Sequence, residues 1–303
     1  MKVAVTGGCG FIGSHVVDAL VDRGHETIVF DNMSTGSFSN LNPGAGLLTG
    51  DVADRSELDS FFTTARPDAV IHLAAQIDVM ASMKNPSFDA MVNIMGSINV
   101  LDMCKKHGVG RMVYASSAAV YGNPVYLGID ELHPCNPESF YGYSKLVPEY
   151  YIRKYSSLTG MTHAILRYAN VYGPRQKAEG EGGVVAIFAD RMKKRQDCHI
   201  FGDGTQTRDF VYVKDIAAAN LIALESTESF TANASTSVKI TVNGLFGIMR
   251  EYYGYPVNPV YEPARTGDVQ HSWLANDKIR EILKWTPGYS IREGISDMRK
   301  SDD

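Results

Sequence analysis

Short apolar runs alternate along this chain with longer segments in which apolar residues recur every three or four positions. The runs predict strands at 3–5, 27–30, 46–49, 69–73, 111–115, 163–167 and 211–213. The longer segments predict helices over about 56–65, 86–107, 140–159, 184–195, 215–226 and 242–253. Strands separated by helices pair in parallel through right-handed crossovers. The pattern therefore predicts an α/β fold built on a doubly wound parallel sheet.

The rhythm of the pattern changes after about residue 167. Glycine and proline then predict a long loop around 173–183 and strong turns at 202–204 and 263–267. We expect a larger domain from residues 1–169 plus about 211–234, and a smaller C-terminal α/β lobe from 170–210 plus about 235–303 that binds substrate. Ligands of doubly wound sheets bind at the carboxyl ends of the strands, so polar residues that follow a strand are candidate site residues.

A glycine-rich segment follows the first strand and leads into a helical apolar pattern that begins with Phe11 and Ile12. Gly7 permits a tight turn, Gly10 lets the backbone approach a phosphate, and Gly13 lets the helix pack closely on the strand. The N-terminus of such a helix binds a pyrophosphate. A glycine-rich turn by itself is common in loops, but the order strand, turn, helix favours a dinucleotide site.

The second predicted strand ends at Asp31, eighteen residues after Gly13. A dinucleotide site places a carboxylate there, on the hydroxyls of the adenosine ribose. A 2′-phosphate would meet a like charge, so we predict NAD rather than NADP as the cofactor. Asn32 could assist in this contact. A solvated turn is the alternative explanation, because Asp-Asn after a strand is also ordinary loop chemistry.

Tyr141 and Lys145 are four residues apart in a predicted helix and therefore share one helical face. A phenol has an ordinary pKa near 10, and a neighbouring cation favours its phenolate form. Such a pair can move the proton of an alcohol while a dinucleotide moves the hydride. The same spacing is common on surface helices with no catalytic role. Ser116-Ser117 after a strand, together with the dinucleotide features, favours the catalytic interpretation.

The composition narrows the class of protein. The chain has 303 residues with a formal net charge of −5, and it lacks the basic run or arginine stripe of a nucleic-acid binder. Its four cysteines are scattered without Cys-x-x-Cys spacing, so we expect neither a metal site nor a disulfide framework. No charged leader with an apolar core precedes the first strand, and no apolar run approaches eighteen residues. We expect a cytoplasmic protein with no membrane partner.

The motifs in their order resemble the extended short-chain dehydrogenase/reductase family, and within it the nucleotide-sugar epimerases. The resemblance covers Thr6 to about Pro287 and implies a Rossmann-type sheet. The motifs that carry it are Thr6–Gly13, Asp31-Asn32, Gly50–Val52, His72–Ala75, Ser116–Gly122, Tyr141–Lys145, Arg167–Arg175, Phe201–Gly204, Arg208–Asp215 and Arg265–Asp268.

This resemblance implies roles for individual residues. Catalysis would rest on Ser117, Tyr141 and Lys145, with Lys145 on the nicotinamide ribose and Ser117 between the sugar oxygen and Tyr141. The implied NAD-binding residues are Gly7, Gly10, Phe11, Ile12, Gly13, Asp31, Asn32, Asp51, Val52, Leu73, Ala74, Ala75, Asn93, Tyr141, Lys145 and Tyr168. The implied substrate-binding residues are Ser117, Tyr141, Asn170, Gly183, Val184, Arg208, Arg265, Asp268 and Ser272.

The residues after Ser117 distinguish the reactions of related enzymes. Nucleotide-sugar 4,6-dehydratases carry an Asp-Glu pair there and the related decarboxylases carry a Glu, whereas this chain has Ala118-Ala119. Without that carboxylate the oxidised sugar can only take its hydride back. We therefore expect C4 epimerisation of UDP-glucose and UDP-galactose through a 4-ketose that turns over in the pocket. The alternatives are another nucleotide-sugar epimerase, a dehydratase or decarboxylase, a non-catalytic NAD-binding sensor, and a TDP- or GDP-sugar as substrate.

Two further expectations follow from the resemblance. The position four residues after Asp268 lines the pocket beside the sugar C2 substituent, and here it is Ser272 rather than a bulky Tyr. UDP-N-acetylglucosamine and UDP-N-acetylgalactosamine should then also fit, unless His271 or Trp273 fills the space. A homodimer through a helix bundle is common in the family, and core burial explains the same apolar positions about as well. Those positions are Met91, Ile94, Ile98, Leu101 and Met103 in one helix and Val147, Tyr150 and Tyr151 in another.

Overall fold

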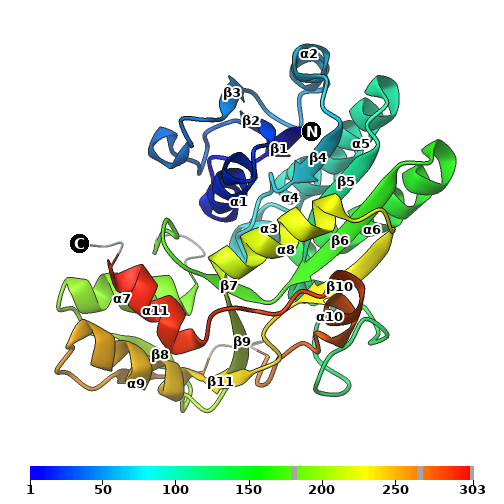
Figure 1. The fold of residues 1–303 in the computed structure, drawn as a ribbon. Helices are drawn as coiled ribbons and strands as arrows, with labels where there is room; N and C mark the ends of the chain where they lie inside the picture. The colour runs from blue at the N-terminus through cyan, green and yellow to red at the C-terminus, as the bar shows by residue number, and fades with distance from the viewer. Residues whose placement is uncertain (179–182, 265–268, 301–303) are drawn as a thin grey trace.

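A parallel seven-stranded sheet forms the centre of the molecule, and the apolar runs predict six of its strands but not the one at 230–234 (Figure 1). The computed structural model describes residues 1–178, 183–264 and 269–300. The strands run in the order β10-β6-β5-β4-β1-β2-β3, and each adjacent pair is parallel. Their bounds are β1 (Lys2–Thr6), β2 (Glu26–Asp31), β3 (Gly46–Thr49), β4 (Ala69–His72), β5 (Arg111–Ser117), β6 (Thr162–Tyr168) and β10 (Phe230–Ala234).

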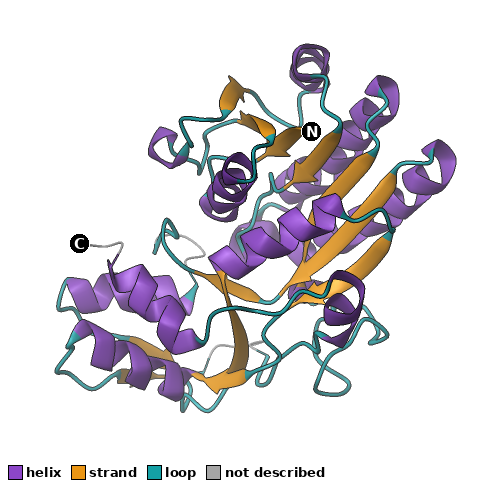
Figure 2. Cartoon of the chain, viewed as in Figure 1, coloured by secondary structure: helices purple, strands orange, loops and turns teal. Residues whose placement is uncertain are grey.

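Helices cover both faces of this sheet (Figure 2), which is why its central strands are apolar on both sides. On one face α1 (Phe11–Asp22) packs against α8 (Val213–Glu225). On the other face α2 (Arg55–Ala65) packs against α5 (Gly96–His107), and α5 packs against α6 (Phe140–Thr159). The two faces bury separate apolar clusters, so each layer has its own core.

The predicted helix over 86–107 is divided into three parts. The short helix α4 (Pro86–Ala90) is followed by a π-helical turn η2 (Met91–Met95) and then by α5. Another short helix, α3 (Val79–Lys84), precedes α4. A π-helical turn inserts one extra residue into the helical ladder and occurs often at functional sites. Here it directs the buried Asn93 toward helix α6, as described below.

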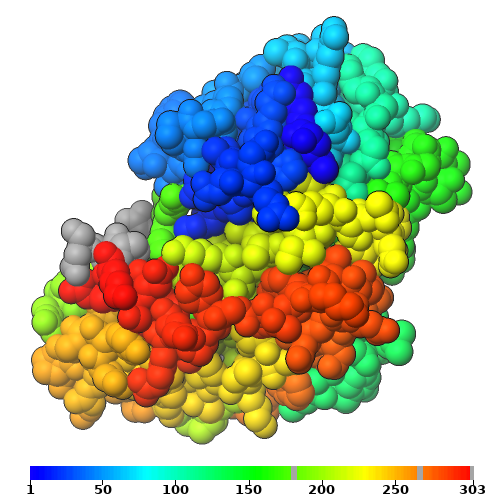
Figure 3. All heavy atoms as spheres, in the orientation of Figure 1, coloured from blue at the N-terminus to red at the C-terminus, as the bar shows by residue number. Residues whose placement is uncertain are grey.

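A second, smaller group of elements lies beside the sheet and has its own apolar core. Figure 3 shows the C-terminal residues gathered in the lower part of the molecule and the N-terminal residues in the upper part. A three-stranded sheet of order β11-β9-β7 and a parallel pair of β8 and β12 are covered by helices. The bounds are β7 (Asn170–Tyr172), α7 (Val184–Lys193), β8 (His199–Phe201), β9 (Thr207–Tyr212), β11 (Lys239–Thr241), α9 (Val242–Tyr253), β12 (Val260–Glu262) and α11 (Ile291–Lys300). The helix α10 (Asp277–Leu283) packs instead on β10 and belongs to the apolar cluster of the central sheet.

The chain passes between the two groups more than once. Residues 211–212 of the predicted strand at 211–213 end β9, and Val213 begins α8. Strand β9 pairs with β7 and β11 and not with the central sheet. Helix α8 and strand β10 then return to the central sheet. Among the residues that the structure describes, no helix is long and apolar enough to cross a membrane. The division into two domains at the boundaries given above stays a prediction.

Candidate active site

The glycine-rich turn after β1 is closely packed at two of its three motif glycines. Gly7 has a φ of +72°, and a Cβ there would lie 2.6 Å from the Ala74 backbone nitrogen. A Cβ on Gly13 would lie 2.0 Å from the Gly7 carbonyl oxygen. A Cβ on Gly10 would meet only the Gly7 carbonyl oxygen, at 3.3 Å. The protein's own packing thus explains Gly7 and Gly13, whereas the space at Gly10 suits an approaching ligand.

Helix α1 begins at this open position. Its N-cap is Gly10, and no side chain caps the first turn, which starts with Phe11 and Ile12. The first N–H groups of a helix have no partner within the helix and carry a partial positive charge. The side chains of Phe11 and Ile12 pack against the apolar clusters, so these two residues offer backbone N–H groups. This helix end fits the pyrophosphate of a dinucleotide.

Asp31 is the last residue of β2, and its carboxylate lies against the glycine-rich turn. The carboxylate accepts hydrogen bonds from the N–H groups of Cys9 and Met33, each at 2.9 Å. Next to it, the amide of Asn32 donates to Asp51 at 3.0 Å, and Val52 is buried under Gly96 of α5. The glycine-rich turn, the Asp31 carboxylate and the Asn32–Asp51 pair therefore meet at the carboxyl ends of the strands. The residues assigned to the pyrophosphate and to the adenosine ribose thus lie next to one another, and their roles stay predictions.

The end of β4 is fixed to the end of β1 by the Thr6 hydroxyl. Its oxygen accepts from the N–H groups of Leu73 and Ala74 and lies 2.6 Å from the His72 Nδ1. Burial, together with the Lys145 charge, lowers the pKa of His72 to about 3, so this histidine is neutral. The backbone of residues 73–75, which the sequence assigns to NAD, is thereby held beside Gly7.

Two residues assigned to NAD are engaged by other protein groups. Asn93 accepts from the Gln76 N–H at 2.8 Å and donates to the Ser144 hydroxyl at 2.9 Å. The Tyr168 hydroxyl donates to Asn220 of α8 at 2.9 Å. Asn93 thus fastens the segment after Ala75 to the helix of the catalytic pair, and Tyr168 fastens β6 to α8.

Helix α6 carries Tyr141 and Lys145 and packs directly on the backbone that follows Ser117. Ser139 caps the helix by accepting from the Gly142 N–H at 3.1 Å. A Cβ on Gly142 would lie 2.7 Å from the Ala119 carbonyl oxygen, so this glycine allows the close approach. The Ser117 hydroxyl ends β5 and accepts from the Ala119 N–H at 3.2 Å. Ser117 and Tyr141 are half-buried, which leaves them open to a substrate.

Lys145 is buried at the centre of this group. Its ammonium donates to the Ala115 carbonyl at 3.0 Å and lies 5.4 Å from the centre of the Tyr114 ring. Burial lowers the pKa of Lys145 to about 8, and the negative charge of Asp89 opposes that shift. The group is therefore still largely protonated at neutral pH, as a cation that supports a phenolate must be.

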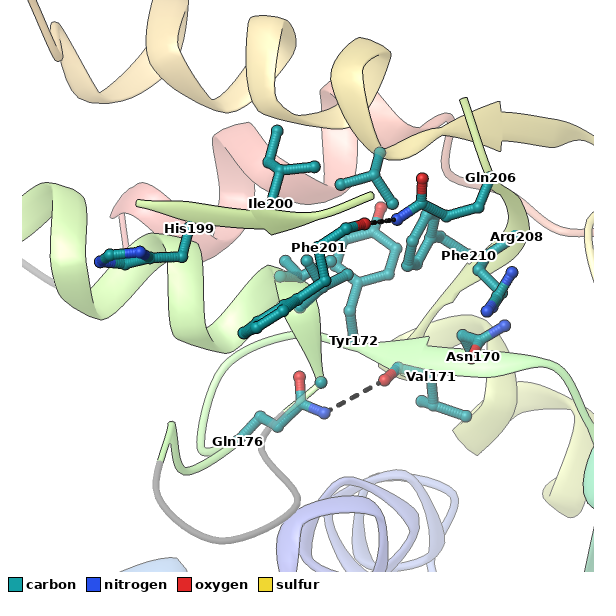
Figure 4. A pocket seen from close by; sticks show the side chains of 14 residues that line it. Asn170, Val171, Tyr172, Gln176, His199, Ile200, Phe201, Gln206, Arg208 and Phe210 are labelled. Atoms are coloured by element: carbon teal, nitrogen blue, oxygen red, sulfur yellow. Dashed lines mark hydrogen bonds between the residues drawn. The ribbon is translucent and has the colours of Figure 1, made fainter. Parts of the chain in front are cut away.

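A pocket of about 250 Å³ lies in the smaller group of elements and contains four of the predicted substrate residues. These are Asn170, Gly183, Val184 and Arg208. Figure 4 shows Asn170 and Arg208 together at one side of the pocket and His199 at the opposite side. Gly183 and Val184 begin α7, whose first turn has no side-chain cap. The pocket thus joins a guanidinium and a helix N-terminus, a combination that suits a diphosphate.

Several pocket residues were not predicted as site residues from the sequence. Phe201 and His199 lie on β8, and the Gln206 amide donates to the Phe201 carbonyl at 2.8 Å (Figure 4). Phe201 begins one of the motifs that carry the family resemblance, and this motif was the sequence feature that could have predicted Phe201 as a site residue. A three-residue strand has no period from which to read the face that points inward.

Ser272 lies next to this region, although it does not line the pocket itself. Its N–H donates to the Thr207 carbonyl at 3.1 Å, beside Arg208. The His271 ring contacts the Thr207 hydroxyl at 3.1 Å, and a Cβ on Gly128 would lie 2.9 Å from the Trp273 ring. His271 is therefore held on Thr207, the residue that Ser272 also bonds, and Trp273 packs against Gly128. Arg265 and Asp268 lie outside the described residues. Within the described ranges, no group of three or more His, Cys, Asp or Glu is placed to hold a metal ion.

Comparison with known proteins identifies the family. The model of the NAD dependent epimerase/dehydratase family matches residues 3–237. The UDP-glucose 4-epimerase of Mycolicibacterium smegmatis is 36% identical over 98% of this chain and 96% of its own length. The UDP-glucose 4-epimerase of Thermotoga maritima, solved with UDP-glucose, is 42% identical with a TM-score of 0.97 and covers 99% of this chain and 98% of its own.

A third similar protein differs in its sugar. It is the UDP-N-acetylglucosamine 4-epimerase of Methanobrevibacter ruminantium M1, solved in complex with UDP-N-acetylmuramic acid. Its structure is 32% identical with a TM-score of 0.94, and it covers 99% of this chain and 97% of its own. These similarities extend over both groups of elements and not over the central sheet alone.

Proposed function

This chain belongs to the NAD dependent epimerase/dehydratase family, and from that premise we propose that it is an NAD-dependent nucleotide-sugar 4-epimerase. One observation carries the proposal. Helix α6 packs through Gly142 on the backbone after Ser117, which brings the serine and the Tyr141–Lys145 pair together. The strands β5 and β1 lie on either side of β4 and run parallel to it. The group after β5 therefore lies at the same carboxyl end of the sheet as the glycine-rich turn after β1.

The roles of the catalytic residues follow from their positions and from the family resemblance. Tyr141 as a phenolate takes the proton from the sugar C4 hydroxyl and later returns it. The Ser117 hydroxyl lies between the sugar oxygen and the phenol, and the Lys145 ammonium favours the phenolate. The glycine-rich turn, the α1 N-terminus and Asp31 would hold NAD, which would supply the hydride acceptor and donor for C4. The pocket would have to let the 4-ketose turn, so that the hydride returns to its other face.

The surroundings of Ser117 argue against elimination or decarboxylation. Ala118 and Ala119 stand where those enzymes have acids. The backbone of Ala119 is in close contact with Gly142 of α6. Glu149, which accepts from the Ser116 hydroxyl, is fully buried and paired with Arg167 at 2.7 Å. It is therefore held away from substrate. A non-catalytic sensor would not require Ser117 and Tyr141 to stay open to solvent.

For the substrate, we propose a UDP-hexose whose diphosphate meets Arg208 and the α7 N-terminus. Arg265 and Asp268 stay predicted partners of the phosphates and the nucleoside ribose. Thymidine and guanosine diphosphates share the same phosphate chemistry and differ in the base. Direct competition among UDP-, TDP- and GDP-sugars for turnover decides between them.

We further propose that N-acetylated sugars are accepted. Ser272 is small, and both of its bulky neighbours are held by other residues. A volume large enough for an acetamido group should therefore stay open beside the sugar. The Ser272→Tyr variant should lose turnover of UDP-N-acetylgalactosamine and keep that of UDP-galactose. Rejection of the N-acetylated pair by the unaltered protein would show that Ser272 is not the determinant.

The proposed homodimer would use the apolar face of α3, α4, η2 and α6. Leu101 and Met103, predicted in this contact, lie instead in the core, 0% and 2% exposed. The exposed apolar side chains of the face are Met80, Met83, Phe88, Met91, Met95, Phe140, Tyr143, Tyr150 and Tyr151. Light scattering should give the mass of a dimer, and Met91→Glu should give a monomer.

The four cysteines are free, which is typical of proteins in a reducing cytoplasm, and we propose that location.

The central experiment is incubation of the NAD-loaded protein with UDP-galactose and with UDP-N-acetylgalactosamine. We expect the C4 epimer of each, at constant total nucleotide sugar and without net change in NAD. A 4-keto-6-deoxy product would identify a dehydratase, and loss of CO2 from a uronate would identify a decarboxylase. Bound NAD with no turnover of any nucleotide sugar would favour the sensor.

A further inference from the structure

A buried carboxylate outside the predicted site lies close to the catalytic helix. Asp89 lies in the short helix α4 and is 1% exposed. One of its oxygens, Oδ1, accepts from the Gln76 amide at 2.8 Å and from the Asn93 amide at 3.2 Å. Its other oxygen, Oδ2, is buried and has no hydrogen-bond partner among the described residues. Two neutral amides do not balance a buried negative charge, which is costly unless a cation compensates it.

The same amides connect Asp89 to the catalytic lysine. Asn93, placed by the π-helical turn, also donates to the Ser144 hydroxyl at 2.9 Å, and Ser144 precedes Lys145. Lys145 is itself buried, with one donor on the Ala115 carbonyl. The Asn93 amide thus links the Asp89 carboxylate to the residue before Lys145. Both charged groups are buried, and among the described residues neither is in a salt bridge.

Other titratable groups around Lys145 are neutral or already paired. Burial lowers the pKa of His72 to about 3 and raises that of Tyr114 well above its ordinary value. Glu149 is paired with Arg167, and Asp102 of α5 with Arg55. Lys84 of α3 is exposed, and neither η2 nor the short 3-10 turn Ala118–Val120 contains a charged residue. Among the described residues around Lys145, Asp89 is the buried carboxylate that is not already paired with a cation.

We propose that Asp89 is a positioning residue that acts as the counter-charge of Lys145 and keeps it in the ammonium form. The proposal rests on the proposed role of Lys145 in the epimerase reaction. With Asp89 in place, the lysine can support the Tyr141 phenolate and donate to the nicotinamide ribose over the working pH range. Without it, burial would favour the neutral amine, which does neither.

Asp89→Asn tests this with little change in shape. The new amide oxygen still accepts from Gln76 and Asn93, and its nitrogen replaces the oxygen that no described donor faces. On the alkaline side of the pH profile, kcat/KM falls where Lys145 loses its proton. In the variant this alkaline limb should lie about one pH unit lower. NAD should be lost from the protein at correspondingly lower pH, measured as the fraction retained after gel filtration. Asp89→Glu, which keeps the charge, should restore both profiles.

A matched control is Asp102→Asn, which removes a carboxylate that bonds Arg55 and Tyr155 instead. It should leave both profiles unchanged. Lower activity of Asp89→Asn at every pH, with the limb and the NAD profile unmoved, would mean that Asp89 only supports the fold and would overturn the proposal. If the unaltered protein turns over no nucleotide sugar, the epimerase function fails, and the NAD-retention profile still decides the role of Asp89.

Discussion

The carboxyl ends of β1, β2, β4 and β5, which we call the cofactor edge, and the substrate pocket hold their side chains in different ways. At the cofactor edge, buried groups bond one another: Thr6 bonds His72, and Asn93 bonds Ser144. At the substrate pocket, Asn170 is exposed and donates to the Asp209 carbonyl, and the half-buried Arg208 donates to the Thr207 and Gln270 carbonyls. The side chains of the first site are thus buried among one another, whereas those of the second are more open to solvent. The proposed mechanism uses both kinds of site, because its cofactor stays fixed while its sugar turns.

The largest effect should come from the fixed site. Tyr141→Phe should lower kcat by about 10³-fold, because the phenol acts on the proton in transit. The affinity for NAD and UDP-sugar should change little, since both ligands have other contacts. Steady-state kinetics together with calorimetric titration separates the two quantities. Full turnover by Tyr141→Phe would end the proposed mechanism, and Tyr143→Phe, on the exposed face of the same helix, is the matched control.

The next effect concerns the stability of that organised half. Glu149→Ala leaves the Arg167 guanidinium buried without its bidentate partner, which should cost about 3 kcal/mol of unfolding free energy. Glu225→Ala breaks the exposed pair with Arg23 and should cost less than about 1 kcal/mol. Urea denaturation measures both. Equal losses of unfolding free energy would show that the buried Glu149–Arg167 pair stabilises the protein no more than the exposed Glu225–Arg23 pair does.

A smaller effect is expected in the adaptable pocket. Arg208→Lys should raise the KM for UDP-galactose by about tenfold with kcat nearly unchanged, because an ammonium lacks the planar fork that suits a diphosphate. Arg195→Lys, at an exposed arginine bonded to Gly254, should change neither constant. A drop in kcat as large as that in kcat/KM would place Arg208 in the chemistry and weaken the contrast between the two sites.

The smallest effect should appear where the two sites meet. The loop after β7 contacts the cofactor side through Arg175 on Asp18 at 2.8 Å, Lys177 on the Thr35 carbonyl at 2.7 Å, and the Pro174 carbonyl on His15. Arg175→Ala should speed NAD release by about twofold to fivefold, as expected for one partly exposed ion pair. Stopped-flow dilution into excess labelled NAD gives the rate. Lys194→Ala, which breaks a surface pair on α7, should leave the rate unchanged.

Much of the cofactor edge could be predicted because its constraints are local in sequence. The glycine spacing, the bounds of α6 and the carboxylate after β2 each lie within one strand-and-helix unit. The π-helical turn at 91–95 could not be predicted, since one inserted residue hardly alters the apolar spacing. Asp89 looked like an ordinary acidic residue near a helix start. Its burial depends on α6, about fifty residues later in the chain.

The substrate pocket was harder to predict because it joins short segments that are distant in sequence. Strands β7 and β8 have three residues each, so neither has a period that reveals its inward face. Arg208 and Asn170 were found only through the family resemblance. Phe201 and His199 were not predicted as site residues, because their neighbours across the pocket come from other parts of the chain.

The position of β10 at the edge of the central sheet has a consequence for how the protein is made. This strand pairs with β6, yet it is synthesised only after β7, α7, β8, β9 and α8. Until about three quarters of the chain has left the ribosome, β6 presents an unpaired apolar edge, which is a hazard for aggregation. Chains interrupted before residue 230 would expose that edge permanently, so quality control in the cell should meet them as aggregation-prone fragments rather than as partial enzymes.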